Sequence, residues 1–255
     1  MNTKARLYGV DLDLLSMDEV VAACRELIES RRPTQQTSLN AGKVVLMDDD
    51  EAVRGALLET DLLTADGQSI VWAGRLMGHA VPERVAGIDL MERLLALAED
   101  RGYPVYFLGA KPTVLTTFVE VVRARYPGLQ IAGYADGFFE DPAHSADLVG
   151  RSTARLVFLG IPSPKKEFFV SRHRDGLGSV LAVGVGGSFD VWAGVTKRAP
   201  VWMQKSGLEW FYRFIQEPRR MWKRYLVGNT RFIILTLKEI RRNRMAKQDA
   251  GRDAT

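Results

Sequence analysis

The chain has 255 residues, 46% of them hydrophobic, and carries a formal net charge of +4. A chain of this length can bury a core large enough for an α/β domain, so its stability requires neither a disulfide framework nor a structural metal. Because Cys24 is the one cysteine and residues 1–6 are charged and poor in apolar side chains, we expect a cytoplasmic protein without a signal peptide.

The first two thirds of the chain alternate short apolar runs with amphipathic stretches of helix length. The first such stretch, residues 17–31, repeats apolar side chains at helical spacing, and Ser16 precedes it as an N-cap. The runs predicted to be strands cover residues 105–109, 129–133, 156–160 and 180–184. This alternation is typical of a mainly parallel sheet flanked by helices, so we predict a Rossmann-like α/β domain over residues 1–198.

Polar residues interrupt segments of this domain that otherwise resemble core. They are Asn40, Asp66, Arg84 and Asp89. Because the carboxyl ends of strands line the ligand crevice in open α/β sheets, we expect a bound nucleotide at the loops that follow the predicted strands. Polar side chains at such loops tend to serve binding or catalysis.

A glycine-rich run at residues 184–190 follows the last predicted strand. Phe189 stands where the dinucleotide fingerprint needs its final glycine, and the one acid about twenty positions further on, Glu209, lies in an aromatic helical segment. The run therefore disfavours a dehydrogenase. The sequence contains no Walker A motif, which excludes a P-loop NTPase.

Residues 160–167 place Lys165, Lys166 and Glu167 where a helix is expected to begin after a strand. Backbone N–H groups at a helix N-terminus, reinforced by lysine charge, can bind a diphosphate without a metal. The alternative is that both lysines are solvent-exposed residues of the first helical turn. The sequence leaves these two interpretations open.

No spacing in the sequence predicts a metal site. His79, His144 and His173 are scattered singly, without the spacing of a ligand pair. Asp-x-Asp spacing occurs at residues 11–13 and 48–50, but neither follows a strong buried-strand pattern. We interpret both acidic segments as solvated turns or caps.

The composition changes near residue 199. Residues 197–247 hold fourteen Lys/Arg against three Asp/Glu, so the remainder of the chain is acidic. Aromatic residues alternate with cations at helical spacing, which predicts a basic amphipathic helical appendage over residues 199–247, followed by a disordered tail at 248–255. Such helices can lie on anionic lipid, although a helical cap with a solvated charged face explains part of the pattern. Residues 176–196 are apolar but rich in glycine, so we predict no transmembrane helix.

These segments together resemble the WecG/TagA/CpsF family of bacterial glycosyltransferases, from about residue 38 to residue 225. The resemblance is carried by Leu39-Asn40-Ala41, Ala65-Asp66-Gly67, residues 83–89, Tyr106-Phe107-Leu108-Gly109, Tyr126-Pro127-Gly128, residues 164–167 and 184–190, Arg198-Ala199-Pro200, residues 209–213, and Glu217-Pro218-Arg219-Arg220. It implies an inverting, metal-independent transferase without a cofactor, which moves a sugar from a UDP donor to an undecaprenyl-diphosphate-linked saccharide.

The resemblance also assigns roles to residues. It makes Asp66 the general base, and it places the lipid diphosphate against Arg213, Arg220 and Arg224. Two departures stand out, because many members have Thr at the position of Ser38 and Gln at that of Lys166. The second departure adds a cation near the donor site, so N-acetylmannosamine, its uronic acid and glucose all stay open as donor sugars.

We therefore expect a donor site, an acceptor site and an anionic membrane surface as partners, with the protein bound peripherally at the inner face of the cell membrane. The donor-site candidates are Ser38, Asn40, Arg84, Lys165, Lys166, Glu167, Gly186, Gly187 and Asp190. Nucleic acid is not an expected partner. The alternatives are a non-enzymatic module that binds membranes or nucleic acid through the basic appendage, and a nucleotide-sugar epimerase or dehydrogenase, which the altered glycine fingerprint opposes.

Overall fold

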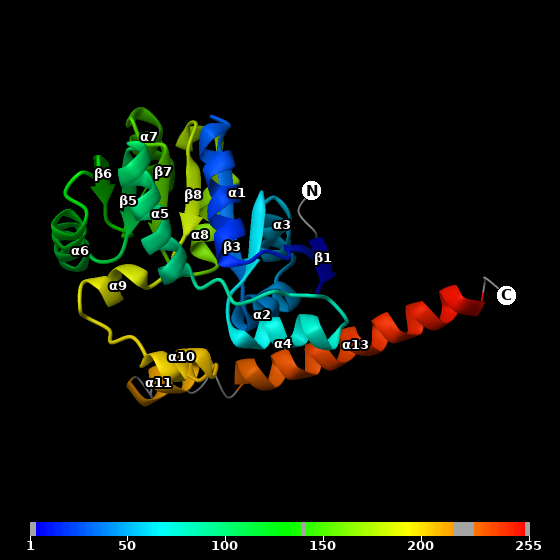
Figure 1. Ribbon diagram of the computed structural model, residues 1–255. Helices are drawn as coiled ribbons and strands as arrows, with labels where there is room; N and C mark the ends of the chain where they lie inside the picture. The colour runs from blue at the N-terminus through cyan, green and yellow to red at the C-terminus, as the bar shows by residue number, and fades with distance from the viewer. Residues whose placement is uncertain (1–3, 139–140, 217–226, 253–255) are drawn as a thin grey trace.

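The computed structural model describes residues 4–138, 141–216 and 227–252. At its centre is a sheet of six parallel strands in the order β4-β3-β8-β7-β5-β6 (Figure 1). The strands are β3 (Thr34–Leu39), β4 (Leu62–Ala65), β5 (Val105–Gly109), β6 (Ile131–Ala135), β7 (Leu156–Gly160) and β8 (Leu181–Gly184). The predicted Rossmann-like α/β class is confirmed.

The apolar runs form strands because helices cover both faces of the sheet. Along β7, Leu156 and Phe158 enter a core shared with α1, α5 and α6, whereas Val157 and Leu159 enter a second core shared with α7 and α8. This two-residue alternation between two cores explains the continuous apolar run of β7. The prediction for 129–133 was two residues early, since β6 begins at Ile131.

The helices of this layer agree with the amphipathic stretches. They are α1 (Met17–Glu29), α2 (Ala41–Asp49), α3 (Glu51–Leu58), α4 (Gln68–Leu76), α5 (Gly87–Arg101), α6 (Pro112–Arg125), α7 (Pro142–Arg151), α8 (Lys165–His173) and α9 (Ser188–Trp192), with a 3-10 turn at η1 (Asp175–Leu177). Ser16 caps α1 as predicted: its hydroxyl accepts from the Glu19 N–H, and the Glu19 carboxylate accepts from the Ser16 N–H. Cys24 is buried in α1, and burial raises the pKa of its thiol to about 12.

Phe189 fills the core where the dinucleotide fingerprint would have a glycine. Its ring stacks on Phe118 at 4.2 Å between centroids. A methyl group added at Gly160 would lie 2.5 Å from the Phe189 ring, so the end of β7 accommodates this ring only because residue 160 has no side chain. The turn after β8 is therefore built around an aromatic anchor and not around a dinucleotide.

A two-stranded hairpin precedes the sheet and corrects one interpretation made from the sequence. It consists of β1 (Lys4–Leu7) and β2 (Val10–Asp13), which pair antiparallel. Asp13 is buried, accepts from the Leu63 N–H at 2.9 Å and pairs with Lys4 at 3.5 Å, so residues 11–13 are not a solvated turn. The second acidic segment does contain a cap, because Asp50 accepts from the Ala52 N–H at the start of α3.

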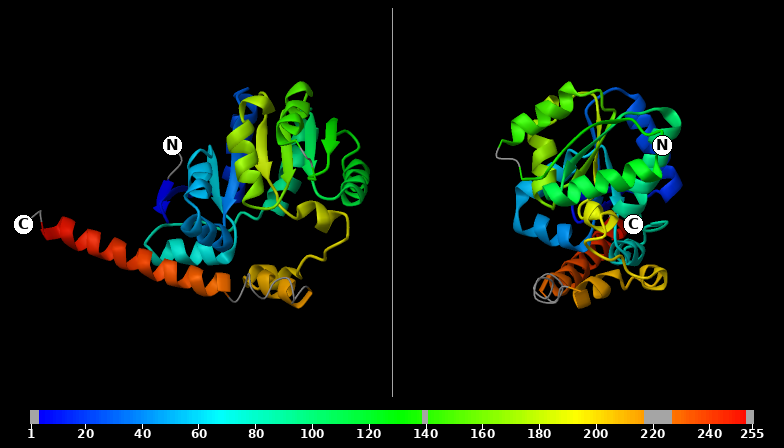
Figure 2. Two further views of the ribbon diagram at one scale, coloured as in Figure 1. Left: turned by 180° about the vertical axis from the view of Figure 1, so that it is seen from behind. Right: turned by 90° about the vertical axis from the view of Figure 1, so that its left-hand side faces the viewer.

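The C-terminal appendage is helical where it is described. Its helices are α10 (Val201–Lys205), α11 (Glu209–Gln216) and α13 (Gly228–Arg252), and they lie along the edge of the sheet where the strands end (Figures 1 and 2). α13 includes residues 248–252, which the composition assigns to a disordered tail. Within the described part of the chain, no helix combines the length and the apolar character needed to cross a bilayer.

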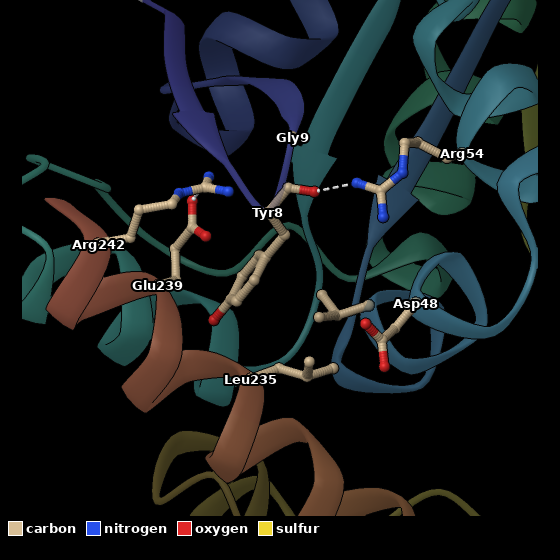
Figure 3. Close-up of a pocket in the computed structure, with 8 residues that line it drawn as sticks. Tyr8, Gly9, Asp48, Arg54, Leu235, Glu239 and Arg242 are labelled. Carbon is tan, nitrogen blue, oxygen red and sulfur yellow. Dashed lines mark hydrogen bonds and ion pairs between the residues drawn. The ribbon is translucent and has the colours of Figure 1, made fainter.

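One face of α13 docks on the α/β domain. Phe232 is buried beside the Tyr8 ring, the Tyr8 hydroxyl hydrogen-bonds to Thr236 at 2.8 Å, and Arg231 contacts Asp48 and Asp49 at the end of α2. Between α13, α2 and the β1–β2 turn lies a polar cavity of about 160 Å³ (Figure 3). This face of α13 therefore packs on the α/β domain as a helical cap, which the sequence had left as the alternative to membrane binding.

The docking contact predicts that Phe232→Ala lowers the free energy of unfolding more than Ile233→Ala does. Loss of a buried phenylalanine ring costs about 3 kcal/mol, whereas Ile233→Ala on the exposed side of the same turn should change the free energy of unfolding by less than about 0.5 kcal/mol. Urea denaturation measures both, and hydrogen exchange along α13 reports its release. Equal effects of the two substitutions would show that α13 is not held by this face.

Candidate active site

The ends of β3 and β4 bring three of the candidate residues into one region. The Asp66 N–H donates to the Leu39 carbonyl at 2.8 Å, and the Val85 N–H donates to the Ala65 carbonyl at 2.8 Å. These bonds place Asp66 next to Asn40 and to the loop that carries Arg84. Asn40 caps α2, where its side-chain oxygen accepts from the Lys43 N–H at 3.0 Å.

A buried charge cluster of Lys43, Lys166 and Glu167 lies behind these strand ends. Both lysine Nζ atoms are 2.8 Å from the same carboxylate oxygen, Glu167 Oε1. Their side chains are 2% and 7% exposed, and that of Glu167 is fully buried. Two cations share one anion, so the cluster carries a net charge of +1 in a region that water scarcely reaches.

Polar groups of β3 and of the loop after β7 complete the cluster. Lys43 Nζ donates to Thr37 Oγ1 at 2.8 Å and to the carbonyl of Ser38. Lys166 Nζ donates to the Ser163 hydroxyl, which in turn donates to Glu167 Oε1 at 3.1 Å. Ser38 thus positions the Lys43 side chain through its backbone carbonyl.

The pKa values of the cluster follow from burial and from its neighbours. Burial and the charge of Lys166 lower the pKa of Lys43 to about 8, against the opposing effect of Glu167 and of Asp66. Burial alone would raise the pKa of Glu167, but Lys43 and Lys166 lower it to about 2. Since Asp66 affects the titration of Lys43, its carboxylate lies within electrostatic reach of the cluster.

Gly184 makes the close packing of the cluster possible. A methyl group at this position would lie 2.7 Å from Lys166 Cε and 3.2 Å from Thr37 Oγ1. Any side chain at the end of β8 would therefore push the lysine away from Glu167. Glycine is therefore required at the end of this strand because the side chain of Lys166 packs against residue 184.

The helix predicted to begin at the lysines is confirmed, because α8 starts at Lys165. The two lysines nevertheless diverge. Lys166 enters the buried cluster, whereas Lys165 is exposed and its Nζ donates to the Gly137 carbonyl at 3.2 Å. The interpretation as a solvent-exposed residue of the first helical turn therefore holds for Lys165 and not for Lys166, and diphosphate binding stays a prediction.

Lys43 is the residue that the sequence analysis missed. It lies in α2 between apolar neighbours and is the largest fully buried side chain of the described residues. The available signal was its spacing, because a lysine three residues after the Asn40 cap falls on the same helical face as apolar Val44 and Met47. A cation on a buried face needs a partner, which here comes from α8.

The turn after β8 carries Gly186, Gly187 and Asp190. Gly186 adopts a positive φ of +54°, and Gly187 is the N-cap of α9. The N–H groups of Val185 and Gly186 already donate to the Leu159 carbonyl. These two backbone N–H groups are therefore not available to a ligand, although a glycine-rich sequence suggests a row of available amides.

Charged residues of the 83–89 motif connect the site to the appendage. Arg84 Nη1 is 2.6 Å from Glu209 of α11, and both side chains are partly buried. Asp89 accepts two hydrogen bonds from Arg198, each at 2.7 Å. The structure thus gives Arg84 a structural partner in the appendage, close to the loop of Asp66.

Three arginines of the appendage that the resemblance assigns to the lipid diphosphate have no described side chain. Arg220 and Arg224 lie outside the described residues, and the side chain of Arg213 in α11 is likewise outside the description. Among the residues that are described, no three His, Cys, Asp or Glu side chains gather as a metal ligand set.

Known proteins resemble this chain over most of its length. The sequence model of the glycosyl transferase WecG/TagA/CpsF family matches residues 5–246. A protein of Bacillus spizizenii (strain ATCC 23059 / NRRL B-14472 / W23) is 39% identical over 170 residues, which cover 67% of this chain and 66% of the relative. A protein of Bacillus subtilis (strain 168) is 36% identical over 183 residues, which cover 72% of this chain and 71% of the relative. Both are named N-acetylglucosaminyldiphosphoundecaprenol N-acetyl-beta-D-mannosaminyltransferase, and the chain spans about two thirds of their length.

The buried cluster predicts a pH-dependent effect of Glu167→Gln. At neutral pH the substitution leaves two buried lysines without an anion, which should lower the free energy of unfolding by about 3–5 kcal/mol. Because the pKa of Glu167 is lowered to about 2, the unfolded chain binds a proton before the folded chain does as the pH falls below about 4. The stability that Glu167 provides is lost in that window, so the difference between wild type and variant should shrink between pH 4 and pH 2.

Urea denaturation at a series of pH values measures this difference. Lys165→Gln, next to the cluster but exposed, is the control and should change stability by less than about 0.5 kcal/mol at any pH. A gap between wild type and Glu167→Gln that stays constant down to pH 2 would contradict the role of the carboxylate.

Proposed function

The chain belongs to the WecG/TagA/CpsF family of glycosyl transferases, and from this premise we propose that it transfers a sugar from a UDP donor to a saccharide carried on a polyprenyl diphosphate. The observation that carries the proposal is the position of Asp66 at the end of β4, within electrostatic reach of the buried charge cluster. Single displacement at an anomeric carbon needs a base for the acceptor hydroxyl and positive charge for the leaving diphosphate. Asp66 and the cluster supply these two groups.

The relatives support the acceptor class. Their name describes transfer of N-acetylmannosamine to N-acetylglucosamine on diphosphoundecaprenol. For this chain we propose an undecaprenyl-diphosphate-linked saccharide as acceptor, in the synthesis of a cell-surface polysaccharide. The reaction inverts the anomeric centre, because a single displacement by the acceptor hydroxyl attacks opposite to the leaving UDP.

Charge balance explains why two lysines share one carboxylate. With Asp66 ionised, the charges of Asp66, Glu167, Lys43 and Lys166 sum to zero. When the acceptor proton moves to Asp66, the region is left with one surplus positive charge at the moment when negative charge develops on the leaving diphosphate. Electrostatic stabilisation of that kind takes the place of a metal ion in the proposed mechanism.

The donor site extends from the cluster along the strand ends. The Asn40 amide is placed to bind a sugar hydroxyl, and Gly186, Gly187 and Asp190 line the adjacent turn. N-acetylmannosamine, its uronic acid and glucose are the donor sugars we propose. Lys166 does not select among them, because its ammonium is buried and already paired with Glu167 and Ser163.

The outer face of α13 supports contact with an anionic membrane. Opposite the buried Phe232, this helix exposes Ile233, Ile234 and Leu237 together with cationic Lys238 and Arg241. An apolar stripe flanked by positive charge fits the boundary between lipid headgroups and acyl chains. The proposed location is peripheral, at the membrane face that presents the lipid-linked acceptor. UDP binding separates this proposal from a non-enzymatic membrane-binding module, which has no need of a nucleotide.

Asp66→Asn should lower kcat by about 10²–10⁴-fold because an amide cannot accept the acceptor proton. UDP binding should be retained. The matched control is Asp136→Asn, since Ala135-Asp136-Gly137 repeats the triplet around Asp66 at the end of β6, where Asp136 accepts from the Phe138 N–H. Product formation from a panel of UDP sugars, measured by mass spectrometry without added metal, tests both. Unchanged turnover in Asp66→Asn would remove the assigned base.

Exposed cations of α13 should govern membrane attachment. Replacing Lys238, Arg241 and Arg244 by Gln should weaken sedimentation with anionic vesicles by about a hundredfold, because each cation near such a surface contributes about 1 kcal/mol. The same number of substitutions on the α/β domain, at Arg101, Arg123 and Arg151, serves as the control. Equal loss of vesicle binding in the two triple variants would contradict attachment through α13.

A further inference from the structure

Helix α4 exposes an apolar face that the proposed chemistry does not use. Trp72 is 53% exposed and Leu76 is 69% exposed, and with Arg75 they line a surface pocket of about 440 Å³. The three residues occupy positions i, i+3 and i+4 of one helical face. We call this site the α4 pocket.

The opposite face of α4 is fixed to the domain. Ile70, Val71 and Ala73 are buried, and a methyl group at Gly74 would lie 2.4 Å from Val81. The guanidinium of Arg75 is also held, because it donates to the Val81 carbonyl at 3.0 Å and to that of Pro82 at 2.7 Å. The charge of Arg75 is therefore already engaged, and the other two described residues that line the α4 pocket, Trp72 and Leu76, are apolar.

The α4 pocket begins close to the catalytic candidate. α4 starts two residues after Asp66, and at 1.5 Å per residue Trp72 and Leu76 follow at about 9 Å and 15 Å along the chain direction. The turn between α10 and α11 borders it, since a methyl group at Gly207 would lie 2.9 Å from Gln68 and 3.5 Å from Trp72. Figures 1 and 2 show α4 beside the first part of α13 at the edge where the strands end.

We propose that the α4 pocket binds the first isoprene units of the acceptor's polyprenyl chain, an inference that rests on the proposed function. An acceptor whose sugar hydroxyl reaches Asp66 must direct its diphosphate away from that carboxylate, and the hydrocarbon chain follows the diphosphate. The helical rise places Trp72 and Leu76 about 9 Å and 15 Å beyond Asp66, which is the scale of one sugar and a diphosphate. Apolar walls with an engaged arginine suit a hydrocarbon, whereas a nucleotide or a second saccharide would find few hydrogen-bonding groups there.

The α4 pocket also lies beside α13, whose outer face is proposed to meet the membrane (Figures 1 and 2). Trp202, Trp210 and Phe211 of α10 and α11 are exposed on the neighbouring helices. A prenyl chain that leaves the α4 pocket therefore finds exposed aromatic side chains nearby. This proximity distinguishes a lipid chain from a second copy of the protein, which would need a matching rigid face.

Kinetics with two acceptors test the proposal. The full chain and the variants Trp72→Gln and Leu76→Gln would be assayed with one saccharide diphosphate, attached either to a long polyprenyl chain in detergent micelles or to a methyl group. Each substitution should raise KM for the polyprenyl acceptor about tenfold, because it removes apolar area that would contact the prenyl chain. KM for the methyl acceptor, KM for the donor and kcat should stay within about twofold of wild type. Leu148→Gln on α7, 41% exposed and away from the site, is the matched control.

The possible outcomes separate the alternatives. Activity of the wild type on the methyl acceptor establishes the proposed function independently of the α4 pocket, and its absence on both acceptors would refute that function itself. An equal rise of KM for both acceptors, or no rise for either, would overturn the prenyl site. Loss of binding to acceptor-free anionic vesicles in Trp72→Gln would identify a membrane contact, and a changed association state in sedimentation velocity would identify a self-interface. Either of the last two results overturns the proposal.

Discussion

The shared carboxylate of Glu167 is the constraint on which the arrangement of the site depends. A buried lysine requires an anion, and two buried lysines with one anion are tolerated only when hydrogen bonds and nearby charge supply the remainder. Thr37, Ser38 and Ser163 supply the hydrogen bonds, and Asp66 supplies the charge. These partners come from β3, β4 and the loop after β7, so the cluster fixes how three strand ends and two helices meet.

Much of the fold could be predicted because strands covered on both faces are usually continuous apolar runs. Residues 105–109 and 156–160 show this directly, and both are strands. β3 could not be found in this way, since its sequence TQQTSL contains one large apolar residue although all six residues are buried. Its polar side chains bond within the sheet: Gln36 Nε2 donates to Thr64 Oγ1 at 3.0 Å. A buried strand made of polar residues gives no apolar signal, and only its neighbours reveal why it is stable.

The site was predictable where polar residues interrupt core-like segments, and less so where charges serve assembly. Asn40 and Asp66 are two such residues, and they lie together at the ends of β3 and β4. Arg84 and Asp89 instead pair with Glu209 and Arg198, so their side chains join the catalytic loop to the appendage. The sequence shows that these residues are charged and partly enclosed, but it does not show which distant segment provides the partner. Lys43 escaped notice for the same reason, because its partner is 124 positions away in the chain.

The appendage, the acceptor and the charge cluster form one functional unit in this account, with α13 clamped to the far end of the helix that carries Lys43. In the proposed mechanism, the positive charge of the cluster stabilises the diphosphate of the UDP donor. Calorimetry of UDP binding in EDTA tests this role by comparing wild type with Lys166→Gln, because the variant keeps the Lys43–Glu167 ion pair and removes one of the two cations. We expect wild type to bind UDP without metal and Lys166→Gln to bind UDP about tenfold to a hundredfold more weakly. Equal affinities, or no UDP binding by the wild type, would contradict it.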